Sequence, residues 1–153
     1  MRIALLLSTV CLTAYATKAV AQQPTAQPKP AEHHAAGSVT LAHVAGTWTI
    51  ESAVKTADGK DTSVTSELVV PADGKSLVTK LTGRDPIPTR IVARGGDSLV
   101  TEAGPFQSVV RSGQTVTTRE TLHFKGDTLS GTIEAKYASG DVVKGLIKGA
   151  RKK

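Results

Sequence analysis

After residue 45 the chain consists of short segments in which apolar and polar residues alternate, interrupted at regular intervals by glycine and aspartate. Alternation with a period of two is typical of a β-strand with one buried face. No apolar stripe of helical length lies between these segments. The pattern predicts an all-β domain. Its short connectors predict antiparallel pairing of sequence neighbours, because parallel strands need long crossover connections.

The connectors between the segments are rich in residues that form tight turns. Glycine tolerates the positive φ that hairpin turns require, and aspartate side chains hydrogen-bond to nearby backbone. Many short strands in series either pack as two sheets or close on themselves, and closure removes exposed strand edges. We therefore favour an antiparallel up-and-down β-barrel of eight or nine strands over a sandwich. The predicted strands are 46–54, 62–70, 76–82, 88–94, 98–103, 106–112, 115–124, 128–137 and 141–150.

The first part of the chain predicts export. Arg2 precedes an apolar segment at 3–16, and Ala19-Val20-Ala21 supplies the small residues that signal peptidase requires. We expect cleavage after Ala21, so that residues 1–21 are a signal peptide and the protein is periplasmic or secreted. The alternative is a membrane anchor, but the apolar segment is too short to span a bilayer. No stable anchor is expected.

Residues 22–38 are rich in alanine, glutamine and proline and hold almost no large apolar side chain. Such a segment buries too little apolar surface to offset the entropy lost on ordering, so it predicts a disordered tether. Residues 39–153 then form the single folded domain. Its lead-in at 39–45 is interpreted as one helical turn over the end of the domain.

Charge and cysteine content exclude several functions. Loss of Arg2 and Lys18 with the signal would lower the formal net charge of +6 by two, and the remaining basic residues are spread along the strands. Nucleic-acid binding needs a basic face interleaved with aromatic residues, and neither is present. The only cysteine, Cys11, lies within the signal. The mature chain therefore has no disulfide, thiol nucleophile or cysteine metal ligand.

The sequence shows no catalytic arrangement. All seven aspartates lie in or beside predicted turns, where turn formation already accounts for them. His123 is three residues from Glu120, which places the two side chains on opposite faces of a strand. No serine has a base and an orienting acid at a recognisable spacing. We therefore expect a non-catalytic protein without a metal or cofactor.

Two features at the ends of the domain resemble the lipocalin and calycin group of up-and-down barrels, in its small bacterial exported form. Gly46 and Trp48 open the first predicted strand, and Arg151 ends the last. In that group the tryptophan packs across the closed end of the barrel beneath a basic side chain, with a packing and cation–π role. The resemblance implies this barrel-closing role for the three residues. A C-terminal helix, a long lid loop and a disulfide are not recognisable.

The inward faces of the predicted strands repeat one pattern, with large apolar residues near the strand ends and small or hydroxylated ones mid-strand. A barrel of this size either fills its interior with side chains or encloses one small ligand. The pattern fits a cavity, and it also fits a filled core in which small residues permit strong coiling. The candidate ligand-binding residues are Ser66, Thr79, Thr101, Ser108, Thr118 and Glu120.

Glu120 is the one charged residue placed on an inward face. An unpaired buried carboxylate is costly. Glu120 is therefore either a polar anchor in a pocket with Thr118, or it is turned outward by a bulge or paired across a neighbouring strand.

We expect an exported, non-catalytic binding protein that captures a small, partly apolar molecule in the barrel, because few aromatic residues are present to line a large apolar site. The alternative is a structural or interaction protein of the cell envelope with a filled core and no ligand. Its candidate contact residues are the outward valines Val69, Val92, Val100 and Val109.

Overall fold

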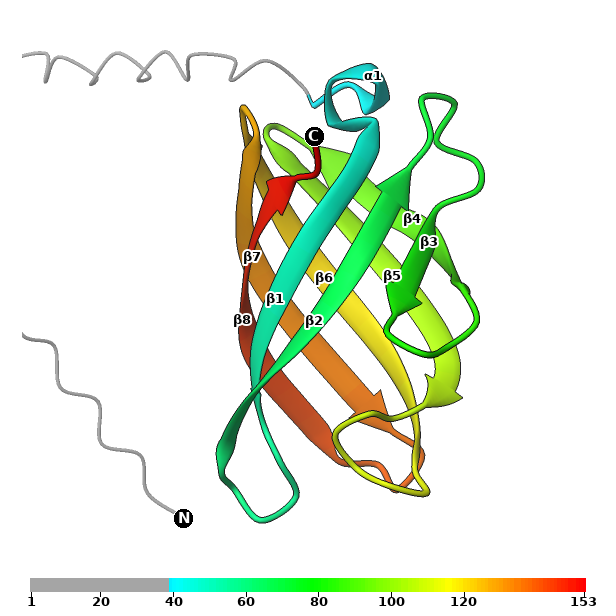
Figure 1. Cartoon of the computed structure of the whole chain (residues 1–153), viewed down its shortest axis with the longest axis vertical. Coiled ribbons are helices and arrows are strands. Elements are labelled where there is room, and N and C mark those ends of the chain that lie inside the picture. The colour runs from blue at the N-terminus through cyan, green and yellow to red at the C-terminus, as the bar shows by residue number, and fades with distance from the viewer. Residues whose placement is uncertain (1–38) are drawn as a thin grey trace, which may run out of the picture. The chain divides into compact units, whose positions relative to one another are not determined.

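The computed structural model describes residues 39–153. They form one closed barrel of antiparallel strands, each paired with its neighbour in sequence, and the last strand closes on the first (Figure 1). A single helical turn, α1 (Leu41–Val44), precedes the barrel where a lead-in turn was predicted. The predicted signal peptide (1–21) and tether (22–38) lie outside the described residues. No helix within 39–153 is long and apolar enough to cross a membrane.

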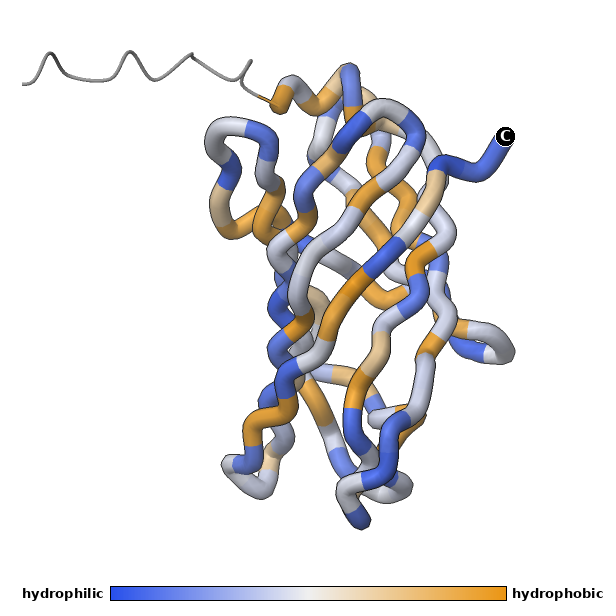
Figure 2. The backbone as a smooth tube through the Cα atoms, turned by 90° about the vertical axis from the view of Figure 1, so that its left-hand side faces the viewer, coloured by the Kyte–Doolittle hydropathy of each residue, from blue (hydrophilic) through white to orange (hydrophobic). Residues whose placement is uncertain are grey.

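The predicted all-β class and up-and-down barrel are confirmed. Buried and exposed side chains alternate along most strands, and Figure 2 shows hydropathy changing in step along the backbone. In chain order the strands are β1 (Gly46–Lys55), β2 (Asp61–Val70), β3 (Val78–Leu81), β4 (Ile87–Gly95), β5 (Ser98–Gln107), β6 (Thr115–Lys125), β7 (Thr128–Tyr137) and β8 (Val142–Arg151).

The barrel has eight strands, so the prediction of two separate strands at 98–103 and 106–112 is wrong. One strand, β5, covers the first of these segments and continues into the second. Residues 108–114 then form an irregular connection, the β5–β6 loop, in place of the end of a ninth strand.

A bulge at Gly104 explains this difference. The pairing of β5 with β6 shifts between Ala103 and Phe106 and then resumes. Gly104 has a φ of 117°, and a Cβ there would lie 2.9 Å from the carbonyl oxygen of Val116. Glycine is needed here because it allows this backbone conformation and this close approach of the strands. Residues 104–105, which separate two of the predicted strands, are therefore a bulge inside one strand.

One end of the barrel is closed by packing around Trp48 of β1. The side chain is fully buried, and its indole Nε1 donates a hydrogen bond of 2.8 Å to the carbonyl oxygen of Val44 in α1. Phe124 meets the indole edge-on, with ring centroids 4.9 Å apart. The Arg151 guanidinium lies 4.3 Å from the centroid of the indole on another side. Trp48 thus links α1, β1, β6 and β8.

Arg151 ties this end together through polar contacts as well. Its Nε donates to Asp127 Oδ1 at 3.0 Å, and its Nη2 donates to the His43 carbonyl at 2.6 Å. Its Nη1 donates to the Ala45 carbonyl. A Cβ on Gly46, whose φ is 131°, would lie 2.9 Å from that Nη1. The structure therefore places Gly46, Trp48 and Arg151 in the arrangement that the resemblance implies, and the fold is compatible with that of calycins.

The core beside Trp48 is a continuous apolar cluster. Its side chains come from α1, from five of the strands and from the segment that leads into β3, so burial of this cluster holds the barrel closed through the hydrophobic effect. Its buried members include Val44, Ile50, Leu68, Val70, Leu77, Leu122, Leu129 and Ile147.

Candidate functional site

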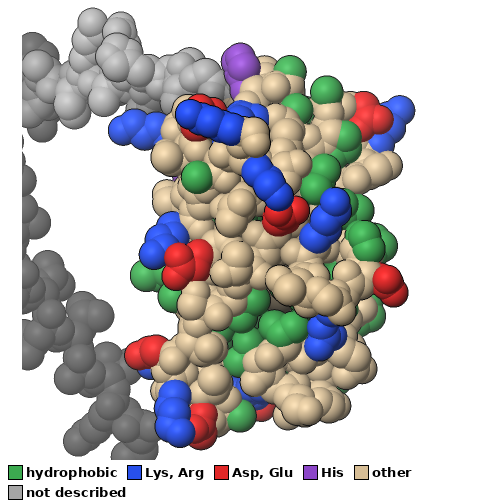
Figure 3. All heavy atoms as spheres, viewed as in Figure 1, with side chains coloured by type: hydrophobic (Ala, Val, Ile, Leu, Met, Phe, Trp, Pro, Cys, Tyr) green, Lys and Arg blue, Asp and Glu red, His purple; other side chains and the backbone are tan. Residues whose placement is uncertain are grey.

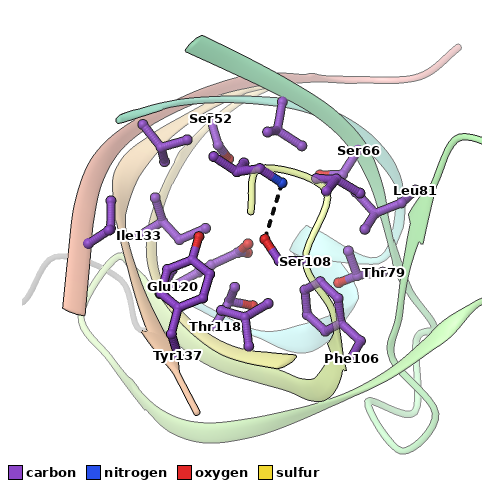
Figure 4. Close-up of a pocket in the computed structure, with 17 residues that line it drawn as sticks. Ser52, Ser66, Thr79, Leu81, Phe106, Ser108, Thr118, Glu120, Ile133 and Tyr137 are labelled. Carbon is purple, nitrogen blue, oxygen red and sulfur yellow. Dashed lines mark hydrogen bonds between the residues drawn. The ribbon is translucent and has the colours of Figure 1, made fainter. Parts of the chain in front are cut away.

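The other half of the barrel, toward the β1–β2, β5–β6 and β7–β8 connections, encloses a cavity (Figure 4). The open volume of this cavity is about 60 Å³, which is enough to admit at least one water molecule. The interior is thus hollow here. The apolar part of the wall includes Val54, Val64, Leu81, Val116, Ile133 and Val143, and the polar part includes Ser52, Ser66, Thr79, Ser108, Thr118 and Glu120.

Glu120 in β6 points into this cavity (Figure 4). The residue is 7% exposed, and in the strand register it lies between Thr101 of β5 and Ile133 of β7. β6 pairs with β7 without a bulge from Val116 to Lys125. The alternative in which a bulge turns Glu120 outward therefore does not apply.

The Glu120 carboxyl lies at the cavity wall without a protein partner among the described residues. Within residues 39–153 it has no hydrogen bond and no ion pair, and burial raises its pKa from 4.5 to about 7. The cause is desolvation, because the charged form loses its water and gains no partner. Near neutral pH the carboxyl therefore exchanges between a charged form that only accepts hydrogen bonds and a neutral form that also donates one.

The Ser108 hydroxyl is fixed by the β5–β6 loop. Its oxygen accepts hydrogen bonds from the backbone N–H groups of Val110 at 3.1 Å and Arg111 at 3.0 Å, the first of which is drawn in Figure 4. Two accepted hydrogen bonds occupy both lone pairs of a hydroxyl, which leaves its hydrogen to donate. Ser108 lines the cavity, so it offers the interior a hydrogen-bond donor.

Thr79 has the opposite polarity. Its Oγ1 lies 2.9 Å from Oγ1 of Thr89, and the Thr89 hydroxyl donates to the carbonyl oxygen of Ile87 at 3.1 Å. Since Thr89 has one hydroxyl hydrogen and uses it on Ile87, Thr79 must be the donor between the two threonines. The Thr79 oxygen then uses only its hydrogen, so its lone pairs are free to accept a hydrogen bond inside the cavity.

The β5–β6 loop covers the cavity and is held by Arg111. The Arg111 guanidinium lies 4.3 Å from the centroid of the Tyr137 ring, and its Nη1 is 2.7 Å from Asp141 Oδ2. Its side chain is only 12% exposed. Val110 of the same loop and Tyr137 both line the cavity. One mostly buried cation therefore joins the loop to the β7–β8 hairpin across the end of the barrel.

Five of the six predicted ligand-binding residues face this cavity, namely Ser66, Thr79, Ser108, Thr118 and Glu120. Thr101 does not line it, although it is buried directly opposite Glu120 in the β5–β6 register. Barrel strands are tilted against the barrel axis, so residues opposite each other on neighbouring strands lie at different depths.

Sequence reasoning missed Ser52 and Tyr137, which also line the cavity. Both could have been found from the alternation of the strands. Ser52 lies on the same inward face of β1 as Trp48 and Ile50, and Tyr137 lies on the same inward face of β7 as Ile133. The loop residue Val109 carried no such signal, since its segment was interpreted as a strand and the residue was placed on the outer face.

The outward valines proposed as a contact surface are less exposed than expected. Val69, Val92 and Val100 are half-buried, and only Val109 is exposed. The most exposed large apolar side chain in the described part of the chain is Leu146 of β8, at 69%.

The cavity wall is mainly apolar and carries a few hydrogen-bonding groups. Its wall holds one carboxyl, several hydroxyls and many aliphatic groups, and Glu120 is the only charged residue in its lining. No group of three or more histidine, cysteine, aspartate or glutamate side chains gathers as a metal site within residues 39–153.

No protein-family model, no curated protein and no solved structure matches this chain.

Proposed function

We propose that this protein is an exported, non-catalytic binding protein that reversibly holds a small, partly apolar molecule inside a lipocalin-like barrel. The observation that carries the proposal is the Glu120 carboxyl, which is buried at the cavity wall with no partner among the described residues.

An unpartnered buried carboxyl lowers the stability of the folded chain and has no purpose in a filled core. A guest that hydrogen-bonds to it would relieve this cost in the bound state. Functional sites are where folds tolerate such groups. The apolar wall formed by Val54, Val64 and Ile133 would contact the remainder of the guest.

Three further features support this role. The proposal of export rests on the signal-like segment at 1–21. The proposed role of Glu120 is that of a hydrogen-bonding anchor, as the single carboxyl of the cavity lining. The outer surface offers no competing charged site on the face shown in Figure 3, where basic and acidic side chains are interspersed.

The test is a native mass spectrum of the full chain, purified without denaturation and recorded before and after unfolding. We expect a reproducible small-molecule mass that disappears on unfolding and is absent from the Glu120→Gln variant. The control is Glu134→Gln, which removes a half-exposed carboxylate on the outer face of β7 and should keep the bound mass. A clean apo mass that does not shift with a library of small amphiphiles would contradict the proposal.

The second candidate is an interaction protein that uses its outer surface. It is favoured by the exposed apolar side chains of Leu146 and Val142, both on β8. This role predicts that Leu146→Ser abolishes recognition of a partner, whereas Glu120→Gln leaves it unchanged.

A further inference from the structure

The charge of the cavity lining restricts the guest. Glu120 is the only charged lining residue, and the lining contains no lysine, arginine or histidine. An anionic guest would place a second negative charge beside a buried carboxylate, which disfavours ionisation of both groups. A purely apolar guest would offer no hydrogen bond to Glu120. Only a guest with a cation or a strong donor group supplies what the site lacks.

Size and wall chemistry restrict it further. The cavity is small, with an open volume of about 60 Å³. The walls around this space are aliphatic at Val54, Val64 and Ile133. A small guest with one polar end and one aliphatic end therefore matches both the size of the cavity and the chemistry of its wall.

From these observations we propose that the cavity binds a short-chain aliphatic ammonium ion, whose nitrogen pairs with the Glu120 carboxylate while its chain lies against the aliphatic wall. This inference rests on the proposed binding function and names its ligand class. An ammonium group has three donors and no acceptor, so the free lone pair of Thr79 is a second acceptor available within the same cavity.

The energetics favour such a guest. Burying an ion pair normally requires desolvation of both ions. Here the cost of desolvating Glu120 is incurred when the protein folds, because the residue is already buried in the folded chain. Binding therefore requires desolvation of the ammonium ion alone, and preorganisation of this kind raises affinity.

The proposal also predicts that affinity depends on pH through one group. The residues opposite Glu120 on the neighbouring strands are Thr101 of β5 and Ile133 of β7, and neither side chain titrates. Tyr137 also lines the cavity, and Glu120 is the only carboxyl of the lining. Arg111 lies against Tyr137 and is paired with Asp141. Between pH 6 and pH 8 only Glu120 changes charge in the cavity wall, since aliphatic amines stay protonated throughout.

The test is calorimetric titration of the full chain with three guests of equal length: n-butylammonium chloride, 1-butanol and sodium butyrate. At pH 8 we expect butylammonium to bind at least tenfold more tightly than butanol, with no binding of butyrate. From pH 6 to pH 8 its affinity should rise about tenfold, because the ionised fraction of a carboxyl with a pKa of about 7 rises by that factor.

Variants test the contact itself. Glu120→Gln should lose the preference for butylammonium over butanol, whereas Glu134→Gln should keep it. The guest series on the unmodified chain remains decisive even where Glu120→Gln folds poorly. Binding of butanol or butyrate as tightly as butylammonium would overturn the ammonium proposal and leave the binding function standing. Binding of none of the three guests by the folded chain would overturn both.

Discussion

At the scale of the residue, Glu120 decides how the barrel interior is understood. On the same face of β6, Val116 and Leu122 are buried apolar side chains that need no partner. Glu120 lies on the same inward face of β6, at a cavity whose lining contains no basic side chain to act as its counter-ion. The raised pKa follows from that environment and makes the stability of the protein depend on pH.

We expect Glu120 to lower stability as the pH rises. Because its folded pKa of about 7 lies above its ordinary value of 4.5, the folded state holds a proton that the unfolded state has released between these values. Its stabilising effect is complete below about pH 4.5 and is lost as the pH approaches and passes 7. Between pH 5 and pH 8 the loss should be about 2 to 3 kcal/mol.

Urea unfolding of the protein and of Glu120→Gln at pH 5 and pH 8 measures this loss. The variant should be less sensitive to pH than the unmodified chain by that amount. The exposed control Glu134→Gln should follow the unmodified chain. If the free energy of unfolding changed equally with pH in all three proteins, the Glu120 carboxyl would not have the raised pKa that its burial predicts.

At the scale of the element, the β5–β6 loop and Arg111 hold one end of the barrel. Ser108 caps the loop, and its backbone N–H donates to the Gln114 carbonyl at 2.8 Å, which closes the loop on itself. Arg111 then joins the loop to Tyr137 and Asp141. Val109 and Val110 of the loop line the cavity, so the loop forms part of its wall.

Arg111→Ala should loosen the loop without unfolding the barrel. Loss of the cation–π contact and of the ion pair should lower stability by about 1 to 2 kcal/mol. Amide hydrogen exchange should speed up at Ser108 and Gln114 before it does in β6. Asp141→Asn removes only the ion pair and should have a smaller effect. Unchanged exchange in Arg111→Ala would show that the loop is held by its own hydrogen bonds.

Strand order and barrel closure could be predicted from turn chemistry and alternation, because both signals are local. The bulge at Gly104 could not, since it depends on how closely the β6 backbone approaches. The cavity also depends on depth along tilted strands, which is why Thr101 was grouped wrongly with Ser66 and Thr79. Small inward residues also allow neighbouring strands to approach closely. A Cβ on Gly145 would lie 2.2 Å from the Ala53 carbonyl oxygen, so a larger residue would not fit there.

At the scale of the whole molecule, the two ends of the barrel are closed in similar ways but serve differently. At one end Arg151 lies over Trp48 and pairs with Asp127, next to a continuous apolar cluster. At the other end Arg111 lies over Tyr137, next to the cavity. The first end therefore provides stability, and the second holds the proposed site.

Arg151→Ala tests this division of roles. It removes the contact with Trp48 and three hydrogen bonds, so we expect a loss of about 2 to 3 kcal/mol in the free energy of unfolding. Lys152→Ala removes only an exposed pair with Glu67 and should cost less than about 1 kcal/mol. Affinity for n-butylammonium should stay unchanged in both variants. Equal losses of stability would contradict the closing role of Arg151.

The most direct test of the central claim is the ¹³C NMR titration of the Glu120 carboxyl in the full chain, assigned with Glu120→Gln, without and with n-butylammonium. An unpartnered carboxyl in a guest-binding cavity predicts a midpoint near pH 7 in the free protein and a lower midpoint when the ammonium ion is bound. A midpoint near 4.5 that the guest leaves unchanged would contradict the buried anchor and the binding site built on it.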